Sequence, residues 1–535
     1  MLDMHDLDAL MYTKLDVLGL DNIGIINETC KMLAIPRLTP DNVNLDDEAV
    51  WKSIRDDTTL IFQWESQSAQ AYLKKFMSDE TVAIAKSRIK NFSYIKWFSF
   101  GNGLIRPGCA SFRDDIADGK ATPTGFQELD DFLSITFYKL TMQEQIMLFC
   151  KLFCGYSDAE SDNVRRAIAK KKGTADLLDE MHDRFVEYSS KEYGADKQLL
   201  ERVFPPIKQG ILDASSYGFS WNHSDAYSCI GYISGYLRYY HPLEFLTASF
   251  NTFVGDNEKI ANITAYANKV GIKINPIKFR YSRAAYNFDK SSNSIYAGMQ
   301  TIKYMNAQVS EDLYNLRDKQ FDSFVSLLRV FTGDSRQLDI LIRLGYFSEF
   351  GPTKTLLKTV EYYNKYQCAG NTKQFKKDAL PIEAIPYIET YVIKESPKQY
   401  ILDADGTDKM LRKIVASIPQ EDLPLKERLA AEVEYLGYIT TVIPGAEGNA
   451  YITEMESKTS NFRVKLYDLG TGETHSVKLK KKMYQIYPIE KGNIIAYKID
   501  YEYPWKKDEN GKWQQDITKE KQPLLGWYGV TTKFD

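Results

Sequence analysis

Three observations in the sequence predict a multidomain α+β protein. Its 535 residues suffice for roughly three to four domains of ordinary size. Through much of residues 22–290, apolar residues recur at the spacing of helices. From residue 436 onward, polar and apolar residues alternate instead, which predicts a small antiparallel β-barrel.

The composition is that of a globular protein, with 44% apolar and 26% charged residues. The sequence has no signal-peptide pattern and no apolar run of about 18 residues, so we expect neither secretion nor a membrane span. Cys150 and Cys154 lie one helical turn apart in an apolar stretch, and the six cysteines form no Cys-x-x-Cys pair. We therefore expect reduced core thiols in a cytoplasmic protein rather than a metal site.

The first elements follow from local signals. Residues 1–21 predict a strand and a turn, and Asn22 is the expected N-cap of a helix over 23–34. Residues 35–290 are expected to be mainly helical, with a break at Pro242 because proline cannot continue a helix.

The later segments have a different character. Residues 291–351 predict a strand, a tight turn and a helix, then two short helices around a Thr-Gly-Asp-Ser turn, as in paired helix–turn–helix units. Residues 372–386 are expected to form a loop. Strict alternation predicts a strand over 461–468, with Val464 on one face and Tyr467 on the other.

The first candidate site is the predicted strand that contains Lys14 and Asp16, which would lie on one face. A carboxylate held on a rigid strand beside a cation can grip a divalent metal and a phosphate together. A two-metal site needs more oxygen ligands than this one carboxylate. On the residues alone, an ion pair at the surface is the simpler interpretation.

The second candidate is a predicted basic helix within residues 156–173. Asp162 and Arg166 are one turn apart, and Arg165 and Arg166 point about 100° apart. Both arginines would reach outward only toward an anion, and a triphosphate suits their forked donors. A solvated basic face is the alternative.

The third candidate is the stretch 215–232, where Tyr217, His223, Ser224 and Tyr227 surround a glycine. Such side chains can stack on a base and contact a phosphate or a sugar. A structural histidine is the alternative. Upstream, the consecutive Gln-Glu-Gln at 143–145 indicates either a polar network or the foot of a cleft.

Six short motifs follow one another along the chain: KLDVLGL, FQWES, RPG, QEQIM, GYSDAESDNVRRAIAKKK and YGFSWNHSDAYSCIGYISGYLRYYHPLEF. Their order and approximate spacing resemble those of the bacterial or phage replicative DNA polymerase III alpha subunit, a family C DNA polymerase. The resemblance implies a last palm strand in 1–21 and mostly helical fingers in 22–290. It also implies a tandem helix–hairpin–helix duplex-binding region with a linker in 291–435, and an OB-fold-like β domain in 436–535.

The resemblance also implies roles for single residues. Asp16 matches the last of three palm aspartates that hold two Mg²⁺ ions, and Lys14 matches the palm lysine beside it. The residues implied to face the incoming deoxynucleoside triphosphate (dNTP) are Arg165, Arg166, Lys170, Lys171, Tyr217, Gly218, Phe219, His223, Ser224 and Tyr227.

Other residues are expected at the nucleic acid and at a partner protein. The candidates for contact with primer–template DNA are Arg106, Lys303, Lys478, Lys480, Lys481 and Lys482. Tyr467 is a candidate for stacking on single-stranded template. Gln420, Leu423 and Leu425 have the shape of a sliding-clamp peptide.

The sequence departs from the family pattern at several positions. Trp221 stands where a lysine is expected, Cys109 replaces a proline and Ala169 replaces a glycine, which bears on nucleotide affinity. The hairpin segment 298–306 has one glycine where the family has several, although hairpin amides are expected to grip duplex phosphates. The palm motif with the other two catalytic aspartates does not occur.

The sequence therefore predicts the C-terminal half of a split polymerase that is inactive alone. A second polypeptide would bring the remaining palm and the thumb, and would share the two Mg²⁺ ions. We expect a bacterial or phage-encoded protein in the cytoplasm. The alternatives are a non-catalytic DNA-binding scaffold of the replisome and an inactive gene fragment.

Overall fold

The computed structural model describes Leu10 and residues 19–106, 109–120, 122–170, 174–217, 219–459, 461–507, 512–517 and 519–534. The chain divides into two compact units. The first runs to Phe253 and includes Lys259–Val270, and the second contains Val254–Glu258 and everything from Gly271 onward. The predicted strand that contains Lys14 and Asp16 lies outside the described residues.

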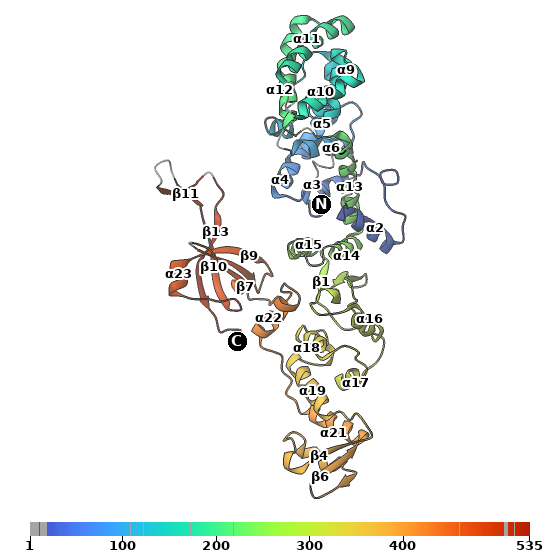
Figure 1. Ribbon diagram of the computed structural model, residues 1–535, viewed down its shortest axis with the longest axis vertical. Helices are drawn as coiled ribbons and strands as arrows, with labels where there is room; N and C mark the ends of the chain where they lie inside the picture. The colour runs from blue at the N-terminus through green and yellow to red at the C-terminus, as the bar shows by residue number, and fades with distance from the viewer. Residues whose placement is uncertain are drawn as a thin grey trace. The chain divides into compact units, whose positions relative to one another are not determined.

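The first unit is helical (blue to green in Figure 1). Its helices are α2 (Asp21–Leu33), α3 (Glu48–Asp56), α4 (Gln67–Phe76), α5 (Asp79–Arg88), α6 (Tyr94–Leu104), α7 (Arg113–Ala117), α8 (Gln127–Leu133), α9 (Gln143–Cys154), α10 (Asp158–Lys170), α11 (Thr174–Tyr193), α12 (Lys197–Tyr217), α13 (Trp221–Tyr240), α14 (Pro242–Thr252) and most of α15 (Asn257–Lys269). The predicted break at Pro242 is confirmed, since α14 begins there.

The helix starts explain part of this pattern. Asp47 and Ser66 accept hydrogen bonds from main-chain N–H groups at the starts of α3 and α4, as N-caps do. The predicted N-cap Asn22 is wrong, because α2 begins one residue earlier and the Asn22 amide instead donates to the Leu60 carbonyl at 3.2 Å. That tertiary bond fixes α2 to the loop after α3.

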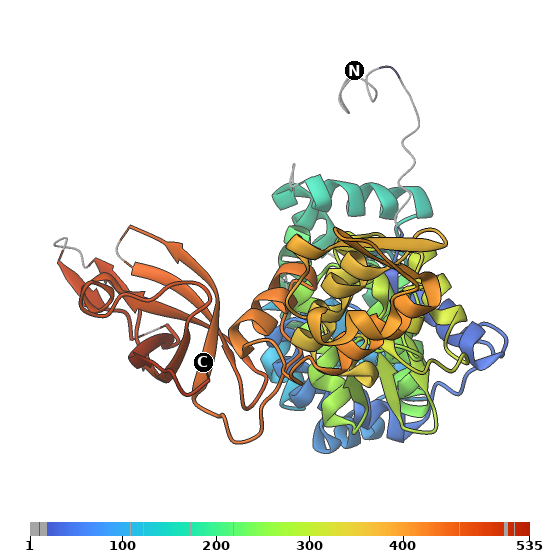
Figure 2. The same ribbon diagram turned by 90° about the horizontal axis from the view of Figure 1, so that it is seen from below.

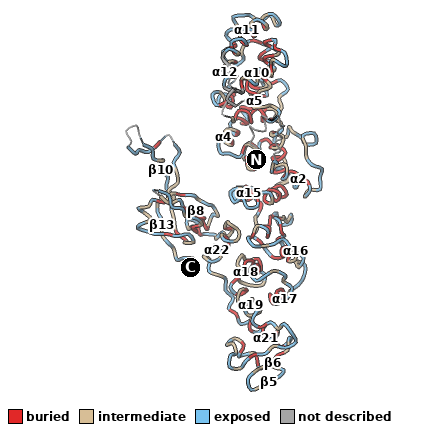
Figure 3. The backbone as a smooth tube through the Cα atoms, viewed as in Figure 1, coloured by how far each residue is buried: buried red, intermediate tan, exposed pale blue. Residues whose placement is uncertain are grey.

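Two of the hydrophobic cores that the described residues form lie in the first unit. One is centred on Trp51, Trp64 and Trp97, which lie between α3, α4 and α6. The other lies within the α9–α12 group, where Figure 3 shows buried positions. Cys150 and Cys154 belong to this second core, which confirms them as core thiols, and burial raises the pKa of Cys150 to about 12.

The second unit begins with a small mixed sheet and four helices. The strands β1 (Lys273–Asn275), β3 (Ser294–Tyr296) and β2 (Asn287–Asp289) lie side by side in that order. The helices are α16 (Ala307–Asn315), α17 (Phe324–Leu328), α18 (Ser335–Arg343) and α19 (Thr353–Tyr366). The two short helices predicted around the Thr-Gly-Asp-Ser turn are confirmed as α17 and α18.

The loop predicted over 372–386 is wrong. Its first part is strand β4 (Thr372–Lys376), which pairs with β6 (Gln399–Asp403), and β5 (Lys394–Glu395) lies on the other side of β6. The helices α20 (Ile385–Ile388) and α21 (Ala404–Ala416) complete this subdomain. The strand is inconspicuous in the sequence because Phe375 alone enters the core, and the polar residues around it lie at a sheet edge.

The last part of the second unit is a closed five-stranded barrel (orange to red in Figure 2). After helix α22 (Leu425–Tyr435), the strands are β7 (Asn449–Ser457), β8 (Asn461–Asp468), β9 (Thr474–Lys480), β10 (Ile494–Glu502) and β13 (Gln522–Val530), in the order β10-β13-β9-β8-β7. Helix α23 (Lys481–Ile486) separates β9 from β10, and the hairpin β11–β12 (Trp505–Lys507 and Trp513–Gln515) precedes β13. The predicted barrel is confirmed, and its architecture is that of an OB-fold.

In strand β8, the predicted position of Val464 is confirmed and that of Tyr467 is wrong. Val464 is buried inside the barrel as predicted. Tyr467 was expected on the outer face but is only 5% exposed, and its hydroxyl donates to the Thr441 carbonyl at 3.1 Å. Leu429 and Ile439 cover that side of the strand, so Tyr467 is not available to stack on a base.

Candidate nucleotide and DNA interfaces

Three motifs that are far apart in the sequence meet at the Arg106 side chain. Its guanidinium donates to the amide oxygen of Gln63, and its Cζ atom lies 4.5 Å from the centroid of the Phe219 ring. Gln63 has a left-handed backbone with φ of 70°, which is uncommon for a residue other than glycine. Sequence reasoning singled out Arg106 and Phe219 but missed Gln63, because a contact across about 40 residues leaves no periodic signal.

An aromatic face continues from this point along α13. The ring of His223 lies 5.9 Å from the ring of Tyr227, which in turn meets Phe62 edge-on at 5.1 Å. His223 is exposed and Tyr227 is half-buried. The two side chains therefore provide a surface on which a nucleobase could stack.

The start of α13 is held in place by Glu144 at the start of α9. The carboxylate accepts a hydrogen bond from the Ser220 hydroxyl at 2.5 Å and another from the Trp221 main-chain N–H at 2.7 Å. A carboxylate at a helix N-terminus also interacts favourably with the helix dipole. Glu144 thus fixes the turn that precedes His223.

The neighbouring Gln145 holds the loop before α9. Its side-chain oxygen accepts from the main-chain N–H groups of Thr141 and Met142 at 3.2 and 3.1 Å. Its amide nitrogen donates to the Thr136 hydroxyl at 2.8 Å. Of the two interpretations of the Gln-Glu-Gln run, these bonds support the polar network.

A polar seam joins α6 to α13 below the aromatic face. Asp225 pairs with Lys96 and accepts from the Ser99 hydroxyl at 2.6 Å. Deeper in the seam, Asn102 donates to the Ser228 hydroxyl at 2.6 Å. Ser224 is fully buried there and its hydroxyl donates to the Ser99 carbonyl, so its side chain is not free to contact a nucleotide as expected.

Trp221, which replaces an expected lysine, has a cation close to it. The Nζ atom of Lys96 lies 5.7 Å from the centroid of the Trp221 ring. Lys96 also pairs with Asp225 on the same helix as Trp221. The cation beside the Trp221 ring therefore comes from α6 and is itself paired with a carboxylate of α13.

The two arginines of α10 converge on one carboxylate. Asp162 accepts from Arg165 at 3.0 and 2.8 Å, and its other oxygen lies 2.7 Å from a terminal nitrogen of Arg166. The hydrogen bond from Arg165, together with the charges of both arginines, lowers the pKa of Asp162. Both arginines were expected to reach outward only toward a bound anion, and this expectation is wrong because Asp162 of the same helix pairs with both.

The remaining nucleotide candidates are described only in part. The backbones of Lys170 and Tyr217 belong to α10 and α12, while nothing is described of their side chains. Lys171 and Gly218 lie outside the described residues.

The lysines predicted to contact DNA differ in their surroundings. Lys303 is exposed in the loop before α16, and its main-chain N–H donates to the Tyr435 carbonyl at 2.9 Å. On the barrel, Lys478 donates to Gln522, Lys480 pairs with Glu502 at 2.8 Å, and Lys481 donates to the Thr459 carbonyl at 3.0 Å. Lys482 is exposed on α23. A DNA strand would have to compete with these barrel contacts.

The predicted clamp peptide is attached to the start of α19. Asp422 accepts from the Thr353 N–H at 2.9 Å, and the Leu423 N–H donates to the Thr353 hydroxyl at 2.9 Å. Gln420 is exposed, but Leu425 begins α22 and packs against the core around Leu429. A sliding clamp could bind this peptide only after these contacts had broken, so the structure does not present it as a free clamp-binding peptide.

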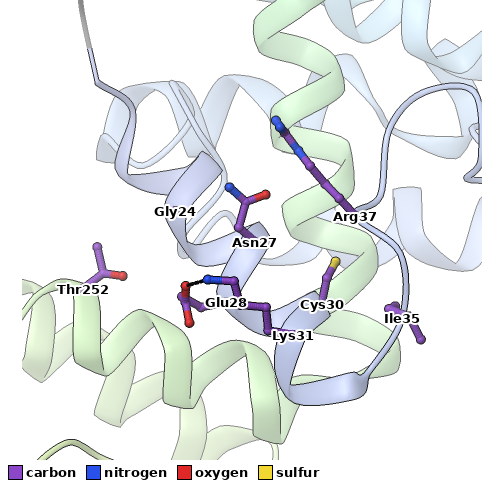
Figure 4. A pocket seen from close by; sticks show the side chains of 8 residues that line it. All are labelled: Gly24, Asn27, Glu28, Cys30, Lys31, Ile35, Arg37 and Thr252. Atoms are coloured by element: carbon purple, nitrogen blue, oxygen red, sulfur yellow. Dashed lines mark hydrogen bonds and ion pairs between the residues drawn. The ribbon is translucent and has the colours of Figure 1, made fainter.

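One cavity in the first unit lies apart from these residues. It has a volume of about 320 Å³ and lies beside α2, with Asn27, Arg37 and Thr252 in its wall (Figure 4). Glu28 and Lys31 form an ion pair at 2.6 Å across its rim. None of the predicted site residues that the structure describes lines it.

No set of metal ligands occurs in the part of the chain that the structure describes. Those residues contain no group of three or more His, Cys, Asp or Glu side chains that could hold a metal ion. The predicted ligand Asp16 lies outside them. Among the same residues, no helix is both long and apolar enough to cross a membrane.

Comparisons with known proteins give matches in both units of the chain. The family model of the bacterial DNA polymerase III alpha subunit finger domain matches residues 22–192, and a helix-hairpin-helix motif model matches 271–357. DNA polymerase III subunit alpha of Bacillus subtilis (strain 168) is 27% identical over 451 residues, which cover 81% of this chain and 36% of that protein.

Two further relatives give the same result. The proteins of the same name from Treponema pallidum (strain Nichols) and Staphylococcus aureus (strain Mu50 / ATCC 700699) are 27% and 28% identical. Their matches cover 64% and 67% of this chain, and 29% and 33% of those proteins. The chain thus spans about a third of the length of these relatives. By these matches and by its fold, the chain is similar to bacterial DNA polymerase III alpha subunits: it matches their finger domain and a helix-hairpin-helix motif, and it has an OB-fold-like barrel.

Proposed function

We propose that this chain takes part in template-directed DNA synthesis, as the fingers and DNA-binding part of a family C DNA polymerase. The reaction transfers a nucleotide from a dNTP to the 3′-hydroxyl of a primer and releases pyrophosphate. The observation that carries the proposal is the meeting of Gln63, Arg106 and Phe219, beside the aromatic face of His223 and Tyr227.

In this proposal α10 and α13 bind different parts of the nucleotide. Arg165 and Arg166 bind the triphosphate, whose several negative charges compete with the single charge of Asp162. His223 and Tyr227 support the base. Glu144 and Asp225 do not contact the nucleotide but hold α13 in position for it.

In the proposed function, the metal ligands are residues outside the described part of the chain. Asp16 would be one ligand of two Mg²⁺ ions, which supply charge stabilisation for the attacking hydroxyl and the leaving pyrophosphate when bound. The other palm aspartates would come from polypeptide outside these 535 residues. We propose that this is a second chain that also brings the thumb.

A reconstitution experiment tests the catalytic proposal. The chain is co-expressed with a polypeptide that contains the missing palm motif, and Mg²⁺-dependent primer extension is measured. We expect extension with the pair, none with the chain alone, and at least about a 100-fold loss with Asp16→Asn, since one metal ligand is removed. Asp21→Asn, a change of the same kind at an exposed position in the first turn of α2, is the control. Equal extension by the Asp16→Asn pair would show the metal assignment to be wrong.

A second function is favoured by one observation on α10 and one on α13. Asp162 already neutralises part of the charge of both arginines, and Trp221 replaces an expected lysine. A non-catalytic DNA-binding scaffold would keep the fold with such changes. It predicts that the reconstituted pair binds primer–template DNA but gives no saturable binding of a dNTP.

A further inference from the structure

Two hairpins of the second unit meet at Tyr304. The first, residues 302–306, leads into α16, which Asn306 caps by accepting from the Val309 N–H at 2.8 Å. The second, residues 329–334, leads into α18, where Asp334 and Gln337 form a capping box. The Gln337 amide also donates to the Tyr304 carbonyl at 3.2 Å, which joins the two hairpins.

The backbone of Tyr304 is unusual for an aromatic residue. Its φ is 68°, in the left-handed region that glycine adopts easily and a bulky side chain adopts at a cost. The side chain is nevertheless 56% exposed rather than packed in the core. Backbone strain without a packing benefit is a common mark of a functional position.

The exposed ring supports an arginine. The Cζ atom of Arg336, in the first turn of α18, lies 3.5 Å from the centroid of the Tyr304 ring. A guanidinium that rests on a ring keeps its N–H edge available for an oxygen ligand. Arg336 is itself exposed, and Lys303 next to Tyr304 is exposed as well.

The described carboxylates around Arg336 do not pair with its guanidinium. In the described part of the chain Arg336 has no ion pair, whereas Arg343 on the same helix lies 2.7 Å from Asp339. The nearby carboxylates serve other groups. Asp334 accepts from the Gln337 N–H at 2.8 Å, and Asp312 accepts from the Thr332 hydroxyl at 2.7 Å.

We propose that the stacked pair of Tyr304 and Arg336 is a contact with the phosphate backbone of duplex DNA, replacing part of the grip that glycine-rich hairpins exert through their amides. Arg336 donates to a phosphate oxygen while the Tyr304 ring holds its plane, and Lys303 adds charge beside it. The inference rests on the DNA-binding part of the proposed function, and it assigns that binding to side chains of the hairpins.

The test uses the full chain and a fluorescent blunt duplex of about 20 base pairs, titrated at several salt concentrations. Arg336→Gln removes one phosphate contact, so binding at 0.1 M salt should weaken about 8-fold and the log–log salt slope should fall by about 0.9. Tyr304→Asn keeps every charge and tolerates the left-handed backbone, so binding should weaken by about two- to five-fold at an unchanged slope.

Arg343→Gln is the matched control, because it removes the same charge from the same helix at a residue already paired with Asp339. It should leave both affinity and slope unchanged. Melting temperatures are measured for all variants, and Arg336→Lys, which keeps the charge but loses the planar fork, should fall between wild type and Arg336→Gln.

Several outcomes would overturn the inference. Equal losses with Arg336→Gln and Arg343→Gln would mean that only net charge matters. Binding by Tyr304→Asn as tight as that of wild type would mean that the ring has no part in the contact. If the wild-type chain does not bind the duplex at any salt concentration, the DNA-binding part of the proposed function fails together with the inference.

Discussion

The helices α13 and α10 both contain residues matched to nucleotide binding, but they are held in very different ways. The start of α13 is fixed by Glu144 from α9 and by the seam of Asp225 and Ser224 against α6. On α10, Asp158 and Glu160 pair with Lys151 of α9 and Arg184 of α11. Its two arginines, Arg165 and Arg166, pair with Asp162 of the same helix, and Arg166 is 63% exposed.

The difference indicates two kinds of contribution to one site. Buried and partly buried hydrogen bonds hold α13 rigidly, so its aromatic face is ready for a ligand before one arrives. The arginines of α10 exchange partners easily, because exposed ion pairs contribute little to stability. Substitutions near α13 should therefore mainly lower the free energy of unfolding. Substitutions of the charged residues on α10 should mainly change the affinity for a dNTP.

The largest effect should follow from filling the close approach between α13 and α3. A Cβ atom at Gly235 would lie 2.5 Å from side-chain atoms of Ile54, which is fully buried. Gly235→Val should lower the free energy of unfolding by about 2 to 3 kcal/mol, measured by urea denaturation.

The control for this change is Gly24→Ala in α2, where an added Cβ would meet no atom within 4 Å. That variant should be as stable as wild type or slightly more so, because alanine favours a helix over glycine. A Gly235→Val protein as stable as wild type would mean that α13 is free to move away from α3, contrary to the comparison.

A smaller effect is expected where α9 holds α13. Glu144→Ala removes the acceptor for the Ser220 hydroxyl and the Trp221 N–H, so it should lower the free energy of unfolding by about 2 kcal/mol. Affinity for a dNTP should fall as well, because His223 loses its fixed turn. Glu80→Ala, at an exposed position in the first turn of α5, should change stability by less than about 0.5 kcal/mol.

The sequence predicted those features that depend on neighbouring residues. The break at Pro242, the strand over 461–468, and the core thiols Cys150 and Cys154 follow from local rules and periodicity. What it could not predict depends on distant partners. Tyr467 alternates as an outward residue should, yet a loop and a helix from outside the barrel cover it.

The candidate site, too, was predictable only in part from the sequence. Its residue types were visible in the motifs, but the arrangement was not, because Gln63, Arg106 and Phe219 meet only through the tertiary fold. Ser224 belongs to a motif and is nevertheless turned into the seam by the turn that Glu144 holds. The strain at Tyr304 has no signal in the sequence, since only the folded hairpin imposes its left-handed backbone.

A substitution on α10 should change the affinity for a dNTP and have little effect on stability. Asp162→Asn releases both guanidiniums at an exposed site, so the urea midpoint at neutral pH should change little while affinity for a dNTP rises a few-fold at low salt. Asp158→Asn, on the same helix but paired with Lys151, is the control and should not raise affinity. Unchanged affinity for Asp162→Asn would show that these arginines do not bind the triphosphate.

The smallest effect concerns acid pH and follows from the same carboxylate. Because Arg165 and Arg166 lower the pKa of Asp162 in the folded protein, its contribution to stability is present above the ordinary value of 3.8 and is lost as the pH falls through the lowered pKa. Urea midpoints of wild type and Asp162→Asn should therefore differ slightly at pH 6 and converge as the pH falls below 3.8. For Glu144→Ala, in contrast, the urea midpoint at pH 6 should be clearly lower than that of wild type. If Asp162→Asn lowers the urea midpoint at pH 6 as much as Glu144→Ala does, α10 is held as firmly as α13, and the two helices do not differ in the way proposed.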